Sequence, residues 1–213
     1  MSTIRIWMTV AALIAGLLVQ GQRAEAAELF VAGGCFWCVE ADFEKVRGVR
    51  EVVSGYTGGS TKNPTYKEVS RGGTGHYEAV RIDYDEGQIS ARQLYDLFFR
   101  SVDPTDAGGQ FCDRGESYRT AIFVTDPAQK QAAEAAKAAA EKALGKKIVT
   151  PIRNAGPFYK AEDYHQDYYK GDSRTLTRFG PIKQKDAYKR YRSGCGRDQR
   201  VKQLWGEAAP FVN

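Results

Sequence analysis

The sequence is poor in side chains that bind metals: it has four cysteines and two histidines among its 213 residues. Cys35 and Cys38 form a close pair, but Cys112 and Cys195 stand alone, so the second pair that a zinc ribbon needs is missing. The spacing of the two histidines favours no mixed site with the cysteines. The sequence therefore predicts no metal centre.

The chain also lacks any segment in which charge of one sign gathers. Its formal charge of +5 is mild for this length, and Lys and Arg are interspersed with Asp and Glu throughout, which argues against a nucleic-acid partner. Internal repeats and low-complexity linkers are missing as well. With 42% hydrophobic and 27% charged residues the composition is that of a globular protein, and we predict a single domain over residues 27–213.

No apolar run has the length of a comfortable membrane span. An apolar stretch at residues 6–19 follows the positive charge of Arg5 and precedes the small residues around Ala24 and Ala26. This pattern predicts an export signal over residues 1–26, cleaved after Ala26, with an uncleaved anchor as the alternative. We therefore expect a periplasmic or secreted protein without stable membrane association. Disulfides form readily there, but a chain of this size folds without them, so chemistry is an equally good reason for the cysteines.

Hydrophobic periodicity divides the domain into strands and helices. Strands are predicted at residues 29–32, 49–54, 76–84, 118–124 and 147–152, and helices after Gly34, at 94–102, at 128–144 and, briefly, at 162–169. Long loops are predicted at 56–75 and 103–115. The order predicts an α+β fold, a split βαβ (ferredoxin-like) two-layer sandwich with the outer Ala-rich helix inserted before the last strand. An irregular C-terminal tail, residues 190–213, is expected to carry Cys195.

Cys35 follows Gly33-Gly34 at the predicted strand-to-helix turn. Free backbone amides and the positive end of the helix dipole stabilise a thiolate at such a position, and the glycines allow a sharp bend and the close approach of a ligand. Phe36 and Trp37 point in different directions around a helix and cannot both face one core, which favours a role as walls of a small apolar pocket. The alternative is a structural cysteine packed among aromatic rings.

Two other functions fit the cysteine pattern. The spacing Cys35-x-x-Cys38 is that of a dithiol redox pair, so a general thiol-disulfide oxidoreductase is one alternative. That class usually has residues such as Gly-Pro or Pro-His between its cysteines, and here they are Phe-Trp. A secreted binding domain with two structural disulfides is the other alternative, and it requires that no thiol be free in the native protein.

The segment GCFWCVE, residues 34–40, resembles the active-site signature of the type A methionine sulfoxide reductases. Further matching segments follow in order: SGYTGG (54–59), NPTY (63–66), GHYEAV (75–80), DRG (113–115) with YR (118–119), and AEDYHQ (161–166). Each is weak alone, but the ordered series, which covers residues 29–165 and beyond, is specific. The resemblance implies reduction of the S-epimer of methionine sulfoxide, free or in proteins, by a monomer without metal or organic cofactor.

The resemblance also implies roles for individual residues. Cys35 would attack the sulfoxide sulfur as the nucleophile. The side chains expected to hold the sulfoxide group are the methyl-binding aromatics Phe36 and Trp37, the oxygen-binding tyrosines Tyr56 and Tyr118, and the aspartate that orders the site, Asp113. Because the chain has 12 tyrosines, only their positions in the motifs single these two out.

Glu78 is the expected proton donor. The resemblance implies this role, and the residue pattern supports it: Glu78 alternates with Val80 and Ile82 along a strand, so its carboxyl group lies on a surface that faces the core. Desolvation there raises the pKa of a carboxyl group and keeps its proton near neutral pH. The alternative is a glutamate at a strand end that is exposed to water.

Attack leaves a sulfenic acid on Cys35, and a second thiol must form a disulfide that an external dithiol then reduces. Cys195, on a glycine-flanked tail, is the preferred resolving cysteine because resolving cysteines of the family commonly lie there. Cys38, one helical turn from Cys35, is the alternative, and Cys112 is the third candidate. Many relatives have glycine at position 38, which leaves the relay open, and a structural Cys38–Cys112 disulfide is a further option. We expect a thioredoxin-like reductant in the cell envelope.

Overall fold

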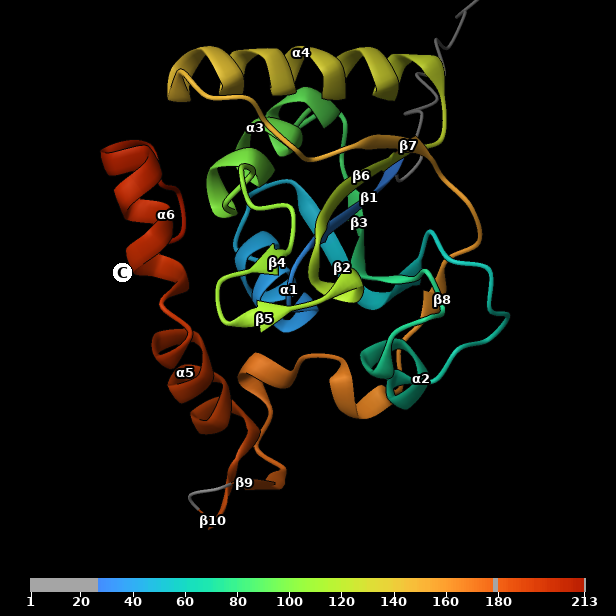
Figure 1. Cartoon of the computed structure of the whole chain (residues 1–213), viewed down its shortest axis with the longest axis vertical. Coiled ribbons are helices and arrows are strands. Elements are labelled where there is room, and N and C mark those ends of the chain that lie inside the picture. The colour runs from blue at the N-terminus through green and yellow to red at the C-terminus, as the bar shows by residue number, and fades with distance from the viewer. Residues whose placement is uncertain (1–26, 178–179, 213) are drawn as a thin grey trace, which may run out of the picture.

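A six-stranded sheet forms the centre of the molecule (Figure 1). The computed structural model describes residues 27–177 and 180–212, so the predicted export signal lies outside the described residues. The strand order is β7-β6-β1-β3-β2-β8, and neighbours are antiparallel except β6 and β7. The bounds are β1 Ala27–Gly33, β2 Val49–Thr57, β3 Tyr77–Tyr84, β6 Thr120–Val124, β7 Ile152–Asn154 and β8 Tyr159–Lys160.

The longer helices predicted from periodicity are α1 (Phe36–Phe43), α3 (Ala91–Ser101) and α4 (Pro127–Leu144). A capping box of Ser90 and Gln93 begins α3. The carboxylate of Asp126 accepts a hydrogen bond from the amide of Gln129 and begins α4, which ends at Gly145 in the left-handed conformation. As predicted, α4 is an outer helix: it packs on α3 at the edge of the molecule (Figure 1) and buries chiefly a stripe of alanines.

The main core includes the side chains on one face of the sheet and those of α1 and α3. The strand register pairs Val31 of β1 with Val80 of β3, and Leu29 with Ile82, and all four side chains are buried. Removal of this apolar surface from water is the main force that stabilises such a fold. Because side chains alternate along β3, Glu78 shares the face of Val80 and Ile82. A carboxyl group is therefore carried into the core.

The two predicted long loops contain short elements. The first includes α2 (Tyr66–Arg71), which begins with a capping box of Thr65 and Glu68. The second includes β4 (Gly109–Gln110) and β5 (Asp113–Arg114), and the 3-10 helix η1 (Glu116–Tyr118) follows it. These elements matter for function because they bring polar residues of both loops to one end of the sheet.

Two predicted elements were wrong in kind or position. The strand predicted at 147–152 is irregular up to Pro151, which has no amide hydrogen to donate, and β7 begins only at Ile152. The helix predicted at 162–169 is replaced by two 3-10 helices, η2 (Asp163–His165) and η3 (Tyr168–Lys170), separated by Asp167 in the left-handed conformation.

The prediction of an irregular C-terminal tail was also wrong. Residues 190–213 include the end of α5 (Gln184–Gly194), α6 (Arg197–Trp205) and the 3-10 helix η4 (Gly206–Ala208), and the strands β9 (Arg174–Thr177) and β10 (Gly180–Lys183) precede them. Figure 1 shows α5 and α6 along one side of the molecule. The two helices bury Tyr188, Val201 and Trp205 together with Arg192 and Arg197. Because two of the inward positions are arginines, apolar periodicity did not reveal the helices. Among the described residues, no helix combines the length and apolarity needed to cross a bilayer.

Candidate active site

Cys35 lies at the turn between β1 and α1, as the sequence predicts. It is the N-cap residue of α1, and its carbonyl accepts the amide of Cys38 at 3.1 Å. The preceding Gly34 has φ of 80°, and a Cβ atom there would lie 2.6 Å from the Cβ of Gln110. Only glycine fits this bend without strain. The turn that carries Cys35 therefore packs closely against β4, which contains Gln110.

The side chain of Cys35 opens into a small cavity of about 60 Å³. Its lining comes from α1, α2, β3, β5, η1 and α5 and consists of Cys35, Phe36, Trp37, Tyr66, Glu78, Asp113, Tyr118 and Tyr191. Aromatic rings, hydroxyl groups, carboxyl groups and one thiol thus face a space that suits a few heavy atoms. Six of the residues predicted for the site line this cavity.

Cys35 is a buried thiol, with 6% of its surface exposed. Burial raises the pKa of Cys35 well above its ordinary value, and the neighbouring Cys38 and Glu78 raise it further. This shift opposes the thiolate that the helix beginning favours, because burial disfavours the charged form. The thiol must lose its proton during the reaction, to a base in the same cavity.

Glu78 can accept this proton once it has given its own proton to the substrate. Its side chain is 2% exposed, and its Oε2 atom accepts a hydrogen bond from the amide of Phe36 at 3.1 Å. Burial raises the pKa of Glu78 to about 8, although the amide of Phe36 opposes the shift. At neutral pH the carboxyl group is therefore mostly protonated and can donate to an oxygen in the cavity.

Tyr66 and Tyr118 both line the cavity, and their hydroxyl groups are hydrogen-bonded to each other. Burial raises the pKa of Tyr66 to about 12, so its hydroxyl remains a donor. Tyr56, which the sequence analysis favoured, contacts the ring of Phe36 but donates its hydroxyl to Glu162 at 2.9 Å and does not line the cavity. The sequence analysis missed Tyr66, although it belongs to the NPTY segment. The signal was the Thr65 cap, which predicts a short helix at that point.

Trp37 is held by three neighbours. Its indole Nε1 donates to Nδ1 of His165 at 3.2 Å, its ring stacks on Tyr168 at 3.8 Å, and Tyr191 meets it edge-on at 6.1 Å. Burial lowers the pKa of His165 to about 4, so the imidazole is neutral and can accept this hydrogen bond. Trp37 is thus a fixed wall of the cavity.

Asp113 and Tyr191 close the remaining side. The hydroxyl of Tyr191 donates to Oδ2 of Asp113 and is also hydrogen-bonded to the thiol of Cys35. Burial raises the pKa of Asp113. Tyr191 lies on α5, in the segment that the sequence analysis assigned to an irregular tail, so its role was missed. Because Tyr191 lies outside the motifs, nothing in the sequence alone pointed to its role.

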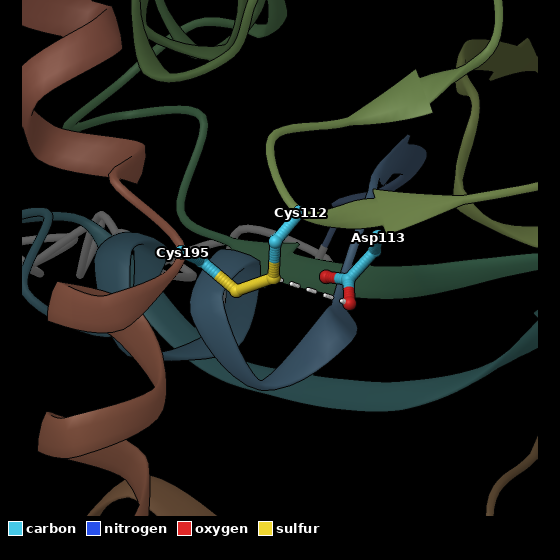
Figure 2. Close-up of side chains that lie close together, drawn as sticks. All are labelled: Cys112, Asp113 and Cys195. Atoms are coloured by element: carbon cyan, nitrogen blue, oxygen red, sulfur yellow. Dashed lines mark hydrogen bonds between the residues drawn. A yellow bond between two sulfur atoms is a disulfide. The ribbon is translucent and has the colours of Figure 1, made fainter.

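The disulfide in the structure is not the Cys38–Cys112 pair that the sequence analysis suggested as an option. Cys112 and Cys195 form a disulfide, whereas Cys35 and Cys38 are free and buried. Figure 2 shows this disulfide beside Asp113, whose Oδ1 atom lies 3.8 Å from the sulfur of Cys112. The suggested Cys38–Cys112 disulfide is wrong, because Cys38 is buried on α1 while Cys112 is exposed at the β4–β5 turn, with a Cα–Cα distance of 4.9 Å to Cys195. Since both sulfurs of the pair are bonded to each other, they offer no thiolate to a metal.

Comparison with known proteins reveals relatives over most of the chain. The sequence model of a family described as peptide methionine sulfoxide reductase matches residues 27–208. The chain is 47% identical over 193 residues to peptide methionine sulfoxide reductase MsrA 2 of Rhizobium meliloti, covering 91% of this chain and 90% of that protein. It is 51% identical over 176 residues to MsrA 2 of Caulobacter vibrioides, covering 82% and 83%.

Solved structures agree with these sequence matches. The fold is similar to that of reduced Mxr1 from Saccharomyces cerevisiae, with a TM-score of 0.65 and 32% identity over 68% of this chain and 85% of that one. It is also similar to methionine sulfoxide reductase A of Corynebacterium diphtheriae, with a TM-score of 0.60 and 32% identity over 70% and 75%. A mixed α/β fold with a central sheet flanked by helices is common to them.

Proposed function

This chain belongs to the peptide methionine sulfoxide reductase family and reduces methionine sulfoxide to methionine, and we propose that the reaction takes place in the cavity beside Cys35. The observation that carries this assignment is the convergence of one thiol, one protonated carboxyl group and two tyrosine hydroxyls on a single space of about 60 Å³. A sulfoxide needs these groups because its oxygen leaves poorly unless it is protonated.

The substrate is held by contacts to its oxygen and its methyl group. In our proposal the sulfoxide oxygen accepts hydrogen bonds from Tyr66 and Tyr118, and the methyl group packs on Phe36 and Trp37. Fixed donors aimed at an oxygen in a dry cavity stabilise the charge that develops there. Because the oxygen and the methyl group would contact different side chains, only one epimer presents its sulfur to Cys35, and the family resemblance indicates the S-epimer.

The chemical step transfers one oxygen atom. Glu78 donates its proton to the sulfoxide oxygen while the sulfur of Cys35 attacks the sulfoxide sulfur, and the thiol proton of Cys35 returns to Glu78. The attack forms an S–S bond between Cys35 and the substrate sulfur, which then bears the protonated oxygen as a hydroxyl group. The hydroxyl group moves to the sulfur of Cys35: the S–O and S–S bonds at the substrate sulfur break, a new S–O bond forms on Cys35 as a sulfenic acid, and the remaining electron pair stays on the sulfur of methionine. The substrate sulfur is reduced by two electrons and the sulfur of Cys35 is oxidised by two, so the step needs no metal or organic cofactor.

The enzyme must then be reduced. A second thiol displaces hydroxide from the sulfenic acid, and an external dithiol opens the resulting disulfide; we propose a thioredoxin-like protein for this role. Cys195, Cys38 and Cys112 are the candidates for the second thiol. The sulfur of Cys195 is bonded to Cys112, so Cys195 can serve only after that bond is opened, whereas Cys38 is a free thiol.

The rival functions fit the structure less well. A general thiol-disulfide oxidoreductase must bring its nucleophile to a disulfide on another protein, yet Cys35 and Cys38 are both buried. A binding domain with two structural disulfides would leave no free thiol, yet both of these cysteines are free. The burial that disfavours these rivals suits a small substrate group in a cavity.

Three further properties are part of the proposal. Residues 27–213 act as a single monomeric domain, built on the split βαβ unit whose four strands follow the order β6-β1-β3-β2. Residues 1–26 act as a cleaved export signal, which would make the enzyme periplasmic or secreted and would place its reductant in the cell envelope. The apolar stretch followed by small residues supports the signal.

Turnover of the separate epimers tests the proposal. With dithiothreitol as reductant, purified enzyme is expected to release methionine from the S-epimer of a blocked methionine sulfoxide at least about 100-fold faster than from the R-epimer, since the wrong epimer loses hydrogen bonds to the oxygen. Equal rates for both epimers would contradict the arrangement of the cavity. Reduction of insulin disulfides in place of either epimer would favour the dithiol oxidoreductase.

A pair of tyrosine substitutions tests the oxygen site. Tyr66→Phe removes a hydroxyl that faces the cavity and is expected to lower kcat about 10- to 100-fold, the usual effect of losing a donor to a developing charge. Tyr56→Phe removes the same atom from a tyrosine whose hydroxyl contacts Glu162, and kcat should stay within about threefold of the wild type. Steady-state kinetics with the S-epimer measures both. A larger loss in Tyr56→Phe than in Tyr66→Phe would contradict the assignment.

A further inference from the structure

The cavity beside Cys35 is too small for more than the reacting group of a substrate. Its volume of about 60 Å³ suits the few heavy atoms of a methyl sulfoxide group. When the substrate is a polypeptide, the backbone of the oxidised methionine and the neighbouring residues must therefore lie on the surface beyond the cavity. How a polypeptide lies there is a question that rests on the proposed function.

A second, larger hollow adjoins the cavity. Its volume is about 490 Å³, within the range of sites that bind small molecules. Trp37 and Tyr191 line both spaces, so their rings form the boundary between them. We call the hollow the hairpin groove, because the β9–β10 hairpin forms one side of it. Its further walls include Tyr168 of η3, Ile182 of β10, Ala187 of α5 and the Cys112–Cys195 disulfide.

The walls of the hairpin groove are mostly apolar, and they are held in place by their neighbours. Tyr168 stacks on Trp37 with ring centroids 3.8 Å apart, and Tyr191 meets Trp37 edge-on at 6.1 Å. The Cys112–Cys195 disulfide ties the end of α5 to the β4–β5 turn. Apolar walls favour an apolar ligand, and walls that are already in place cost little ordering when the ligand binds.

The β9–β10 hairpin turns only one of its faces to the groove. Ile182 lines the groove and is partly buried, whereas Leu176 is 84% exposed. Ile182 pairs with Thr175 across the hairpin and Leu176 pairs with Pro181. Because side chains alternate along each strand, Ile182 and Leu176 lie on opposite faces. A ligand in the groove can therefore contact Ile182 but not Leu176.

We propose that the hairpin groove binds an apolar side chain, such as that of leucine, that lies close to the oxidised methionine in a polypeptide substrate. Consecutive Cα atoms of a polypeptide are about 3.8 Å apart, so a chain whose sulfoxide group fills the cavity passes the rings of Trp37 and Tyr191 within one or two residues. The chain must be extended to follow this path. The groove thus favours apolar stretches of unfolded protein, whose side chains are exposed.

Steady-state kinetics with short peptides tests the preference. Each blocked five-residue peptide has the S-epimer of methionine sulfoxide at its centre and glycine elsewhere, with one glycine replaced by leucine, serine or glutamate. With dithiothreitol as reductant, leucine at one of the four positions is expected to raise kcat/KM about 10-fold over serine. The gain should come chiefly from a lower KM, because a neighbour away from the reacting atoms is bound equally in the ground state and the transition state. A difference below about threefold at all four positions, or a preference for glutamate over leucine, would overturn the inference.

A pair of substitutions on the hairpin locates the preference. Ile182→Ser removes an apolar wall of the groove and is expected to reduce the leucine-to-serine ratio to about threefold or less. Leu176→Ser makes a similar change on the opposite face and should keep the ratio of the wild type. If circular dichroism shows that Ile182→Ser folds poorly, Ala187→Glu, which places a charge in the groove from α5, carries the comparison and should reduce the ratio likewise. A wild-type ratio in either folded groove variant would contradict the proposal.

Photochemical cross-linking locates the neighbouring side chain directly. The Cys35→Ser enzyme is mixed with a sulfoxide peptide that has benzoylphenylalanine at the position where leucine is preferred, and mass spectrometry maps the adduct after irradiation. We expect adducts on Tyr168, Ile182 or Ala187, and an excess of the leucine peptide should suppress them. Adducts confined to residues outside the groove, such as the exposed ring of Tyr164, would rule out the groove as the binding site.

Failure of this inference can be told from failure of the proposed function. A blocked methionine sulfoxide without neighbouring residues needs only the cavity, so its turnover in the absence of any neighbour preference would refute the groove alone. Absent turnover of this small substrate would refute the proposed function itself. An effect of Ile182→Ser that appears only when a thioredoxin-like protein replaces dithiothreitol would assign the groove to the reductant and overturn the inference.

Discussion

Substitution Cys35→Ser is expected to lower kcat/KM for methionine sulfoxide by about 10⁴-fold or more, as loss of the nucleophile does in other covalent mechanisms. The hydroxyl of serine fits the same N-cap position, but it is a far weaker nucleophile than sulfur in a cavity that already disfavours an anion. Burial of Cys35 at 6% exposure makes the site intolerant of a replacement that must ionise. Steady-state release of methionine with dithiothreitol as reductant measures the loss.

A single-turnover control separates this effect from a general disturbance of α1. Without reductant, the wild type should release about one equivalent of methionine, and Cys38→Ser, one turn further along α1, should release the same equivalent because oxygen transfer precedes resolution. Cys35→Ser should release none. Methionine release by Cys35→Ser at more than about one hundredth of the wild-type rate would remove Cys35 from the role of nucleophile.

Substitution Glu78→Gln is expected to lower kcat by about 10²- to 10⁴-fold, the range for loss of a general acid. Glutamine keeps an oxygen that can accept the amide of Phe36, so the local fold is retained while the proton is lost. The pKa of Glu78 is raised to about 8, so the carboxyl group is protonated below this pH and loses its proton as the pH rises through it. The wild-type rate should therefore fall above pH 8, and this limb should vanish in Glu78→Gln.

Glu40 offers a matched control for that pH profile. It is also a buried carboxyl group whose pKa burial raises, to about 7, but its oxygens accept hydrogen bonds from Ser54 and the amide of Asp167 outside the cavity. Glu40→Gln should retain the decline above pH 8. If Glu40→Gln loses that decline, or if Glu78→Gln stays within tenfold of the wild type, Glu78 is not the acid.

Much of the fold was predictable because its signals are local. A short apolar run marks β1, alternation marks β3, and the caps at Asp126 and Gly145 mark α4. The C-terminal helices gave no such signal, because arginines that pair with Asp42 occupy positions where apolar residues are expected. Their stability comes from partners 150 residues earlier in the chain, and such partners are invisible to a reading of local periodicity.

The site was predictable to the extent that motif positions carry it. Cys35, Glu78, Asp113 and Tyr118 line the cavity as the motifs suggested, because each motif lies near the end of a strand or a turn at the same edge of the sheet. Tyr66 lines the cavity in place of the predicted Tyr56. The two tyrosines lie close along the chain, and only the hydrogen bond of Tyr56 to Glu162 shows that its hydroxyl is already engaged.

The ionisation of the cysteines could not be read from their position alone. A helix beginning favours an anion, but at Cys35 the loss of water outweighs this preference, and that loss depends on elements distant in the sequence. Tyr191, hydrogen-bonded to both Asp113 and Cys35, belongs to the same class of contact. The chemistry of the thiols is therefore set by tertiary packing more than by the local turn.

The last helices of the chain complete the cavity beside Cys35. A polypeptide still emerging from the ribosome, or one clipped by a protease before Gln184, contains every signature motif and each strand of the central sheet. It nevertheless lacks the hydroxyl of Tyr191, which donates to Asp113, and the guanidinium of Arg197, which donates to the carbonyl of Gly33. A chain that ends before these helices therefore has an incomplete cavity, because Tyr191 forms one of its sides.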